Sequence, residues 1–140
     1  MKTKFSDIVK IRKRKVDELQ DYLARLEFSI QQTKKEIETL VNDLYSEKTP
    51  NEGSIRELLA IQEIKKAYKI EIENKKAHLS NLLQNKQNII EMLKDANMEY
   101  EKMKHLHELE LKKIADTRKQ KEAKDLDEIA VMLFNNKGAQ

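Results

Sequence analysis

Three histidines are the residues of this 140-residue chain best suited to bind metals or transfer protons near neutral pH. They are His78, His105 and His107, and none has another histidine three or four residues away. A metal site on one helix face needs that spacing, because residues three and four apart lie on the same face. We therefore interpret these histidines as surface or helix-packing residues and expect no metal site.

Nucleotide hydrolysis and carboxylate catalysis have no better support. A phosphate-binding loop needs clustered glycines before a lysine, whereas Gly53 and Gly138 stand far apart. Asp and Glu are numerous, but a catalytic carboxylate pair needs a water-poor pocket, which two paired helices are not expected to form. The chain has no cysteine, which excludes disulfides, thiolate zinc sites and a cysteine nucleophile and fits a reducing compartment. We expect no catalytic residue and no cofactor.

The composition favours long helices over a globular or sheet protein. Charged residues make up 38% of the chain, aromatic residues only 5%, and there are two glycines and one proline. The longest apolar run, Ile129 to Phe134, is far shorter than the roughly 18 residues that span a bilayer. The basic start, Met1 to Lys15, lacks the apolar stretch of a secretory signal. We expect a soluble or peripheral protein.

Apolar residues recur at alternate steps of three and four near the start of the chain, which is the heptad spacing of a coiled coil. Only Arg12 and Thr33 interrupt this seam. Its positions are Phe5, Val9, Arg12, Val16, Leu19, Leu23, Leu26, Ile30, Thr33, Ile37, Leu40 and Leu44. The pattern predicts a helix over about residues 4–46 that packs against a second helix.

A turn is predicted at about residues 47–54, where the only proline and one glycine lie. Two capping boxes compete there. Thr49 with Glu52 would place the proline in the first helical turn, whereas Ser54 with Glu57 would start the second helix later. The chain turns back in either case.

The seam resumes after the turn and predicts a helix over about residues 55–135. Its positions are Leu58, Ile61, Lys65, Tyr68, Ile72, Lys75, Leu79, Leu82, Lys86, Ile89, Leu93, Ala96, Tyr100, Met103 and His107. The lysines weaken the seam, but their methylenes can lie across it with the ammonium group in water, which fixes the register.

The predicted fold is all-α, a two-helix antiparallel coiled-coil hairpin that forms a single domain over residues 1–140. We expect facing residue numbers to sum to about 100, so that the longer second helix overhangs beyond about Tyr100. The overhang would leave apolar residues without an intramolecular partner, which indicates a partner protein or self-association. These residues are Leu106, Leu109, Leu111, Ile114, Leu126, Ile129 and Leu133.

Charge is unevenly distributed, although the net charge is only +3. Residues 2–15 hold seven bases and one acid, and residues 112–124 hold six bases and two acids. Residues 36–57, around the turn, hold six acids and two bases. Since no aromatic residues are interleaved with the bases for stacking on nucleotides, we favour acidic protein surfaces as partners and expect no nucleic acid.

Several apolar residues near the turn lie off the seam. They are Val41, Tyr45, Leu59, Ile64 and Ile70. Such residues either widen a coiled-coil core or form a docking patch, and the sequence leaves both open. Phe28 is also off the seam, but it stands alone.

The two ends of the chain resemble the flagellar FliJ family, small coiled-coil components of the type III export apparatus. Near the start, the residues similar to the family's opening of an aromatic, two aliphatics and an Arg-Lys pair are Phe5, Ile8, Val9, Ile11, Arg12 and Lys13. Near the end, the residues similar to its acid-acid-aliphatic-alanine element are Asp127, Glu128, Ile129 and Ala130. The seam lysines and the few aromatics between Leu59 and Tyr68 depart from the family pattern.

The resemblance implies a non-enzymatic stalk that inserts into the hexameric ring of the export ATPase. It also implies binding to the cytoplasmic domain of the membrane export gate, escort of export chaperones, and a cytoplasmic location that is peripheral to the inner membrane through these partners. The residues implied for ATPase binding are Phe5, Ile8, Arg12, Lys13, Asp127, Glu128 and Ile129. Those implied for gate binding are Leu40, Val41, Leu44, Tyr45, Ile61, Ile64 and Tyr68.

Other functions are compatible with the same pattern. A generic coiled-coil adaptor or chaperone, or the stalk of a virulence-type secretion system, would have the same seams and turn. A nucleic-acid or membrane-surface binder would use the basic stretch from Lys2 to Lys15, with an affinity that falls steeply with salt.

Overall fold

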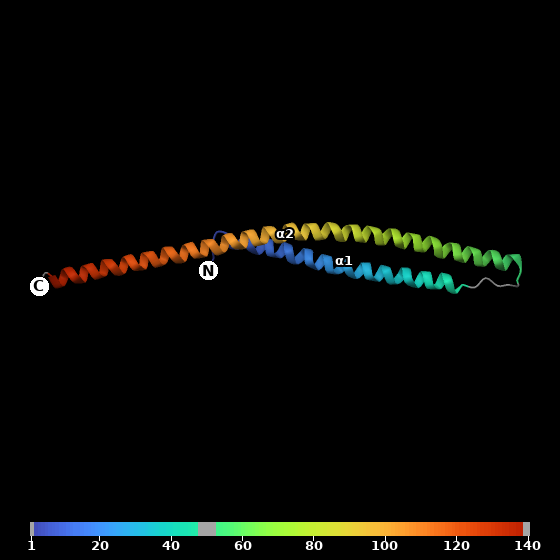
Figure 1. The fold of residues 1–140 in the computed structure, drawn as a ribbon, viewed down its shortest axis with the longest axis horizontal. Helices are drawn as coiled ribbons and strands as arrows, with labels where there is room; N and C mark the ends of the chain where they lie inside the picture. The colour runs from blue at the N-terminus through green and yellow to red at the C-terminus, as the bar shows by residue number, and fades with distance from the viewer. Residues whose placement is uncertain (1, 48–52, 139–140) are drawn as a thin grey trace. The chain divides into compact units, whose positions relative to one another are not determined.

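A computed structural model describes residues 2–47 and 53–138 of the chain, and its two helices confirm the predicted all-α fold (Figure 1). Helix α1 spans Ser6–Ser46 and helix α2 spans Ile55–Gly138. With 41 and 84 residues, respectively, α2 is about twice as long as α1. The sequence placed these helices at about 4–46 and about 55–135.

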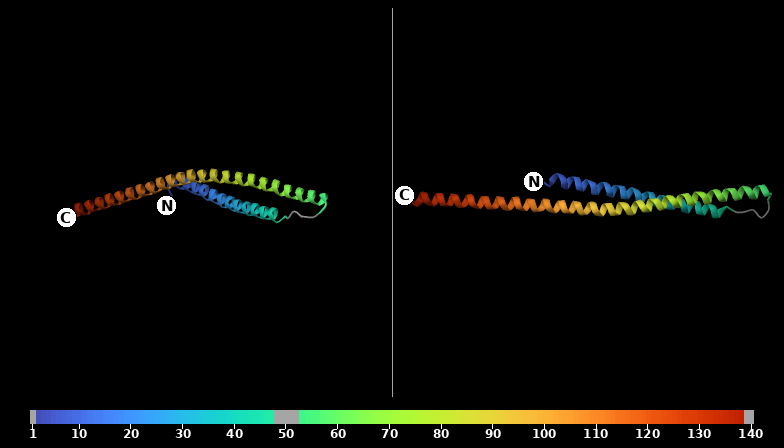
Figure 2. Two further views of the ribbon diagram at one scale, coloured as in Figure 1. Left: turned by 45° about the vertical axis from the view of Figure 1, so that its right-hand side comes forward. Right: turned by 90° about the horizontal axis from the view of Figure 1, so that it is seen from above.

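The chain divides into two compact units. Unit 1 comprises Met1–Val16 and Ala96–Gln140, and unit 2 comprises Asp17–Asp95. Within unit 2, α1 and α2 run side by side in opposite directions, as all three views of the ribbon show (Figures 1 and 2). Unit 2 is therefore the predicted antiparallel helical hairpin.

Ser54 starts α2. Its hydroxyl oxygen accepts a hydrogen bond from the Glu57 backbone N–H at 3.2 Å, and its carbonyl oxygen accepts one from the Leu58 N–H, also at 3.2 Å. Capping of this kind satisfies the free N–H groups of the first turn. Of the two predicted capping boxes, the later one therefore begins the helix, and the earlier box lies in residues 48–52, outside the described part of the chain.

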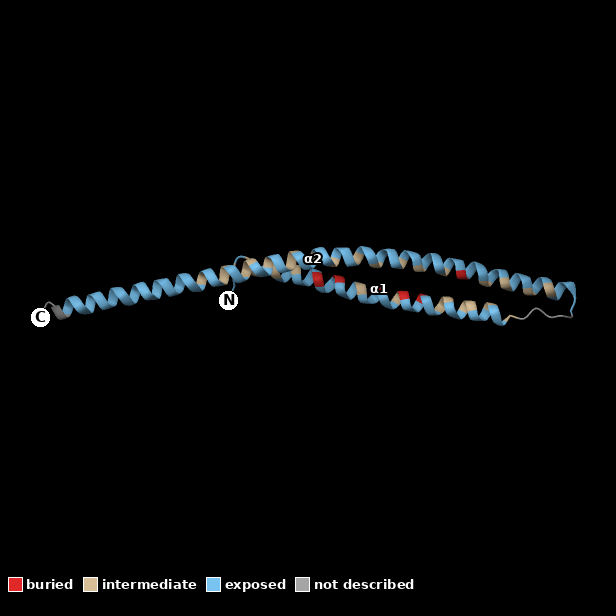
Figure 3. Cartoon of the chain, viewed as in Figure 1, coloured by how far each residue is buried: buried red, intermediate tan, exposed pale blue. Residues whose placement is uncertain are grey.

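The heptad prediction is confirmed along both helices. Every predicted seam position is buried or half-buried, and the buried ones are Val16, Leu19, Leu26, Ile30, Thr33 and Ile72 (Figure 3). Thr33 does not leave a polar group unsatisfied, because its hydroxyl donates to the Ser29 carbonyl oxygen at 2.8 Å. Such i to i−4 bonding is the usual solution for a threonine inside a helix.

Two of the three seam lysines reach acids on the opposite helix of unit 2. The Lys75 Nζ lies 2.7 Å from Glu36 Oε2, and the Lys86 Nζ lies 3.6 Å from Glu27 Oε1. Lys65, Lys75 and Lys86 are all half-buried. The lysine stems thus cover the seam while the charged ends remain in water, as expected from the sequence.

The predicted register is wrong. The two ion pairs across unit 2 join residues whose numbers sum to 111 and 113 rather than 100. In unit 1, the contacts between Thr3 and His107 and between Lys13 and Tyr100 give sums of 110 and 113. Each turn of α1 therefore packs about three helical turns further along α2 than we expected.

The unpaired part of α2 is shorter than predicted as a result. Met103, Leu106 and His107 are half-buried, and so are Leu111 and Ile114. From residue 115 to residue 136 every residue is exposed (Figure 3). We call residues 115–138 the arm. Because the register shift brings the start of α1 level with His107, the overhang does not begin at Tyr100.

Candidate partner-binding surfaces

The residues implied for gate binding form a set at the turn end of unit 2, which we call the turn-end cluster. Leu40, Leu44, Ile61 and Tyr68 are seam residues and are half-buried, as is the flanking Val41. Tyr45 and Ile64 are the members that face solvent, with 81% and 45% of their surface exposed. A partner that docks on this cluster would therefore contact mainly those two side chains.

The apolar residues off the seam have two different roles. Val41 is half-buried, so it widens the hairpin core. Tyr45, Leu59, Ile64 and Ile70 are exposed. Phe28, which we treated as incidental, is also exposed. Exposed large apolar side chains that gather in one region are typical of a docking surface, whereas an isolated one is not.

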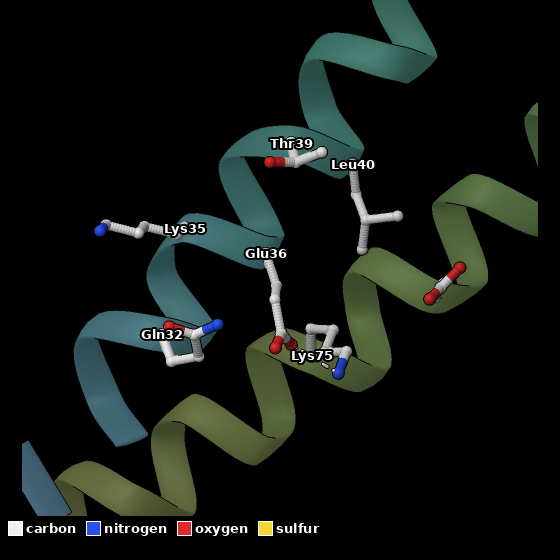
Figure 4. A pocket seen from close by; sticks show the side chains of 7 residues that line it. Gln32, Lys35, Glu36, Thr39, Leu40 and Lys75 are labelled. Carbon is white, nitrogen blue, oxygen red and sulfur yellow. Dashed lines mark ion pairs between the residues drawn. The ribbon is translucent and has the colours of Figure 1, made fainter. Parts of the chain in front are cut away.

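A shallow hollow, open to solvent, lies beside the turn-end cluster, although no pocket was predicted (Figure 4). Glu36 and Lys75 point toward each other across it, and Leu40 points toward α2. The hydrogen bond to the Glu36 carboxylate, together with its negative charge, raises the pKa of Lys75. Since the acid is ion-paired and in contact with water, the hollow lacks the dry environment in which carboxylates act as catalysts.

The N-terminal motif lies in unit 1 against α2. Phe5, Ile8 and Arg12 are half-buried, and Lys13 is exposed. The Lys13 Nζ lies 5.5 Å from the centre of the Tyr100 ring, a distance at which a cation attracts the face of an aromatic ring. Within the motif Phe5, Ile8 and Val9 therefore pack, whereas Lys13 and the 56% exposed Ile11 face solvent.

Arg12 occupies a seam position and lowers the stability of the protein there. Its Nε is buried and has no hydrogen-bond partner among the described residues. A buried donor without an acceptor typically destabilises a protein by about 1–3 kcal/mol. An apolar residue at this seam position would avoid that cost.

The C-terminal motif is fully exposed on the arm. Asp127, Glu128 and Ile129 all face solvent, with Ile129 more than half exposed. Asp127 lies 20 residues beyond His107, which is about 30 Å along a helix. Since Thr3 bonds to His107, the structure does not bring the two end motifs together, and they offer separate contacts.

Thr3 is a residue whose role the sequence reasoning missed. Its hydroxyl oxygen accepts a hydrogen bond from the Phe5 N–H at 3.0 Å and lies 2.7 Å from His107 Nδ1, while its carbonyl oxygen accepts from the Ser6 N–H at 3.1 Å. Thr3 thus caps α1 and ties its start to α2. The sequence contains a hint of this capping role, because threonine and serine are favoured just before the start of a helix.

The described residues include no group of three or more His, Cys, Asp and Glu side chains that could hold a metal ion. His107, for example, lies with its Nδ1 2.7 Å from the Thr3 hydroxyl oxygen. In the same part of the chain, neither helix contains a stretch that is both long and apolar enough to traverse a bilayer.

Comparison with known proteins identifies a family. A family model described as "Flagellar FliJ protein" matches residues 1–139, almost the whole chain. Searches of curated proteins and of solved structures give no significant match. The family match includes both end motifs, the two seams and the turn.

Proposed function

The chain belongs to the FliJ family and is therefore a component of the flagellar export apparatus, and we propose that it is the stalk that links the export ATPase to the membrane export gate. In this proposal unit 1 inserts into the hexameric ATPase ring, and the turn-end cluster of unit 2 binds the cytoplasmic domain of the gate. Export chaperones dock on the same chain. The protein is cytoplasmic and reaches the inner membrane through these partners, and its role is structural rather than enzymatic.

The observation that carries the proposal is the difference between the two units. Unit 1 contains 16 Lys and Arg against 10 Asp and Glu, a net charge of +6. Unit 2 contains 12 against 15, a net charge of −3. Each unit also exposes its own apolar residues, in the arm and in the turn-end cluster. Surfaces of opposite charge favour different partners, because a charged partner is attracted by one unit and repelled by the other.

The tip of the arm supports insertion into a ring. Residues 129–134 are all apolar, and six consecutive residues of a helix point in every direction around its axis. Ile129, Val131, Met132, Leu133 and Phe134 are each more than half exposed. A flat partner would cover only one side of such a helix, whereas a ring covers all sides.

Binding assays with two variants test the proposal. Tyr45→Ala combined with Ile64→Ala removes the exposed part of the turn-end cluster, and Ile129→Asp places a charge on the arm. We expect the first variant to lose binding to the gate domain and keep binding to the export ATPase. We expect the second to lose ATPase binding and ATPase stimulation, and to keep gate binding.

Phe28→Ala is the matched control, because Phe28 is an exposed aromatic residue outside both surfaces. It should change neither interaction. Circular dichroism should show that all these variants keep their helicity. If each variant loses binding to both the gate domain and the ATPase, the assignment of two separate surfaces is wrong. It is equally wrong if both variants keep binding to both partners.

A further inference from the structure

The arm carries a heptad stripe of its own. Its positions, spaced alternately by four and three, are Ala115, Lys119, Glu122, Leu126, Ile129 and Leu133, and we call this set the arm stripe. All six are exposed, and nothing in the described part of the chain covers them. Leu126, for example, is 66% exposed. A stripe with this spacing is typical of a helix that packs lengthwise against another helix.

The two central positions of the arm stripe carry opposite charges. Lys119 and Glu122 occupy sites that face a partner helix in a coiled coil. In a parallel pair of arms each of them would meet its own copy, which places like charges together in the core. In an antiparallel pair Lys119 faces the partner's Glu122, so both charges are compensated. Two arms are therefore complementary in the antiparallel orientation only.

The same antiparallel register pairs two further arm-stripe positions with each other, whereas Leu133 at the end of the stripe would lie opposite the partner's Glu108. Residues that face each other across it have numbers that sum to about 241, so Leu126 packs against the partner's Ala115. At one edge, Arg118 lies beside the partner's Asp125, and Leu111 lies beside the partner's Met132. Each contact occurs twice, because a two-fold axis relates the copies.

We propose that two copies of this chain associate through their arms as an antiparallel homodimer. The paired seam positions run over the segment from Lys112, whose methylenes cover the partner's Ile129, to Ile129 itself, and Leu111 and Met132 flank its ends. These 18 residues extend over about 27 Å of helix. Because this contact is short and its centre is charged, we expect a dissociation constant between about 1 μM and 1 mM. If the proposed ATPase contact through Ile129 is correct, the dimer and the ATPase complex exclude each other.

Sedimentation equilibrium of the full chain tests the association. The average mass should rise with concentration from 16.5 kDa toward twice that value. Lys119→Glu and Glu122→Lys each create two like-charge contacts and should raise the dissociation constant about tenfold or more. The double swap, Lys119→Glu with Glu122→Lys, should restore the dimer. Lys121→Glu makes the same change of charge outside the arm stripe and should leave association unchanged.

Cross-linking tests the orientation, since the chain has no cysteine of its own. Copies with Ala115→Cys, mixed with copies with Leu126→Cys, should form a disulfide between the two kinds of chain. Ala115→Cys alone should not cross-link, because in the antiparallel dimer the two copies of that position lie about 16 Å apart along the axis.

Three results would overturn the proposal. They are a constant mass of 16.5 kDa up to about 1 mM, failure of the double swap to restore association, and self-cross-linking of Ala115→Cys. A constant mass would indicate that the arm stripe binds a different protein and not a second copy of this chain. None of these measurements involves the ATPase or the gate, so their outcome is independent of the proposed function.

Discussion

Ile30→Ala measures how much the seam contributes to stability. Ile30 is 2% exposed and lies in the middle of the α1 seam in unit 2. The substitution removes three carbon atoms, which at about 0.8 kcal/mol each corresponds to about 2.4 kcal/mol of lost burial. Alanine recovers about 0.5 kcal/mol through its higher helix propensity. The expected net loss of unfolding free energy is therefore about 2 kcal/mol.

The cavity that the substitution leaves should add little to this figure. A two-helix hairpin has a core one side chain deep, and in the described residues only five apolar side chains are buried. The space next to residue 30 is thus close to solvent and can collapse or fill with water, unlike a cavity inside a thick core.

Phe28→Ala is the control for this experiment, because it removes a larger side chain that is 71% exposed. We expect it to change stability by no more than about 0.5 kcal/mol. Urea denaturation followed by circular dichroism, at one protein concentration for all variants, gives both values. In thermal melts, Ile30→Ala should lower the midpoint by about 10 °C. If Phe28→Ala costs as much as Ile30→Ala, our placement of the core is wrong.

Three further changes test individual contacts. Glu36→Gln should return the pKa of Lys75 toward 10.5, as measured by NMR titration. Because the pair raises that pKa, its contribution is complete at lower pH and is lost as the pH rises through the folded-state value, so the stabilities of wild type and variant should converge in strongly alkaline solution. Arg12→Leu should stabilise the protein by about 1 kcal/mol, since it removes a buried donor without a partner, and unchanged or lower stability in urea denaturation would contradict this. Thr3→Val removes the cap of α1 and the bond to His107, and should cost about 1 kcal/mol, with faster amide exchange confined to the first turns of α1.

The seams could be predicted from the sequence because a heptad pattern is a local property of each helix. Every position in the two predicted seams is buried or half-buried, including the lysines and Thr33. The start of α2 was narrowed to two capping boxes for the same reason, since caps depend on residues within one turn.

The exposed part of the turn-end cluster was harder to separate from the core. Val41 and Tyr45 each follow a seam leucine, yet Val41 is half-buried and Tyr45 is exposed. The difference is their place in the heptad. Val41 precedes Leu44 by three residues and lies next to the partner helix, whereas Tyr45 begins the outward face of the next turn. Assigning heptad positions, rather than counting off-seam residues, distinguishes them.

The register was the main error, and it was not a local property. Two seams of the same spacing match again after each shift of one heptad, so apolar periodicity alone allows several registers. The length of the turn does not select one of them, because eight residues between the helices can connect ends that lie at different levels. The register is therefore set by seam positions that tolerate only certain residues opposite them, such as a charged residue that needs an opposite charge nearby.

The lysines in the α2 seam are such positions. In a register with a sum of 100, Lys65, Lys75 and Lys86 would all lie level with bases of α1, namely Lys35, Arg25 and Arg14. With a sum near 112, the same lysines lie level with the acids Glu47, Glu36 and Glu27, and two of these pairs are within ion-pair distance. Like charges at a helix interface are unfavourable, so the observed register replaces three basic neighbours of the lysines with three acidic ones. A sum of 112 also sets the seam residues of α2 from Tyr68 onward opposite seam residues of α1, whereas a sum of 100 sets them opposite off-seam residues. Charge at seam positions and the seam pattern therefore favour the same register here, and charge at seam positions also assigns the antiparallel orientation to a pair of arms, where Lys119 and Glu122 are the charged seam residues.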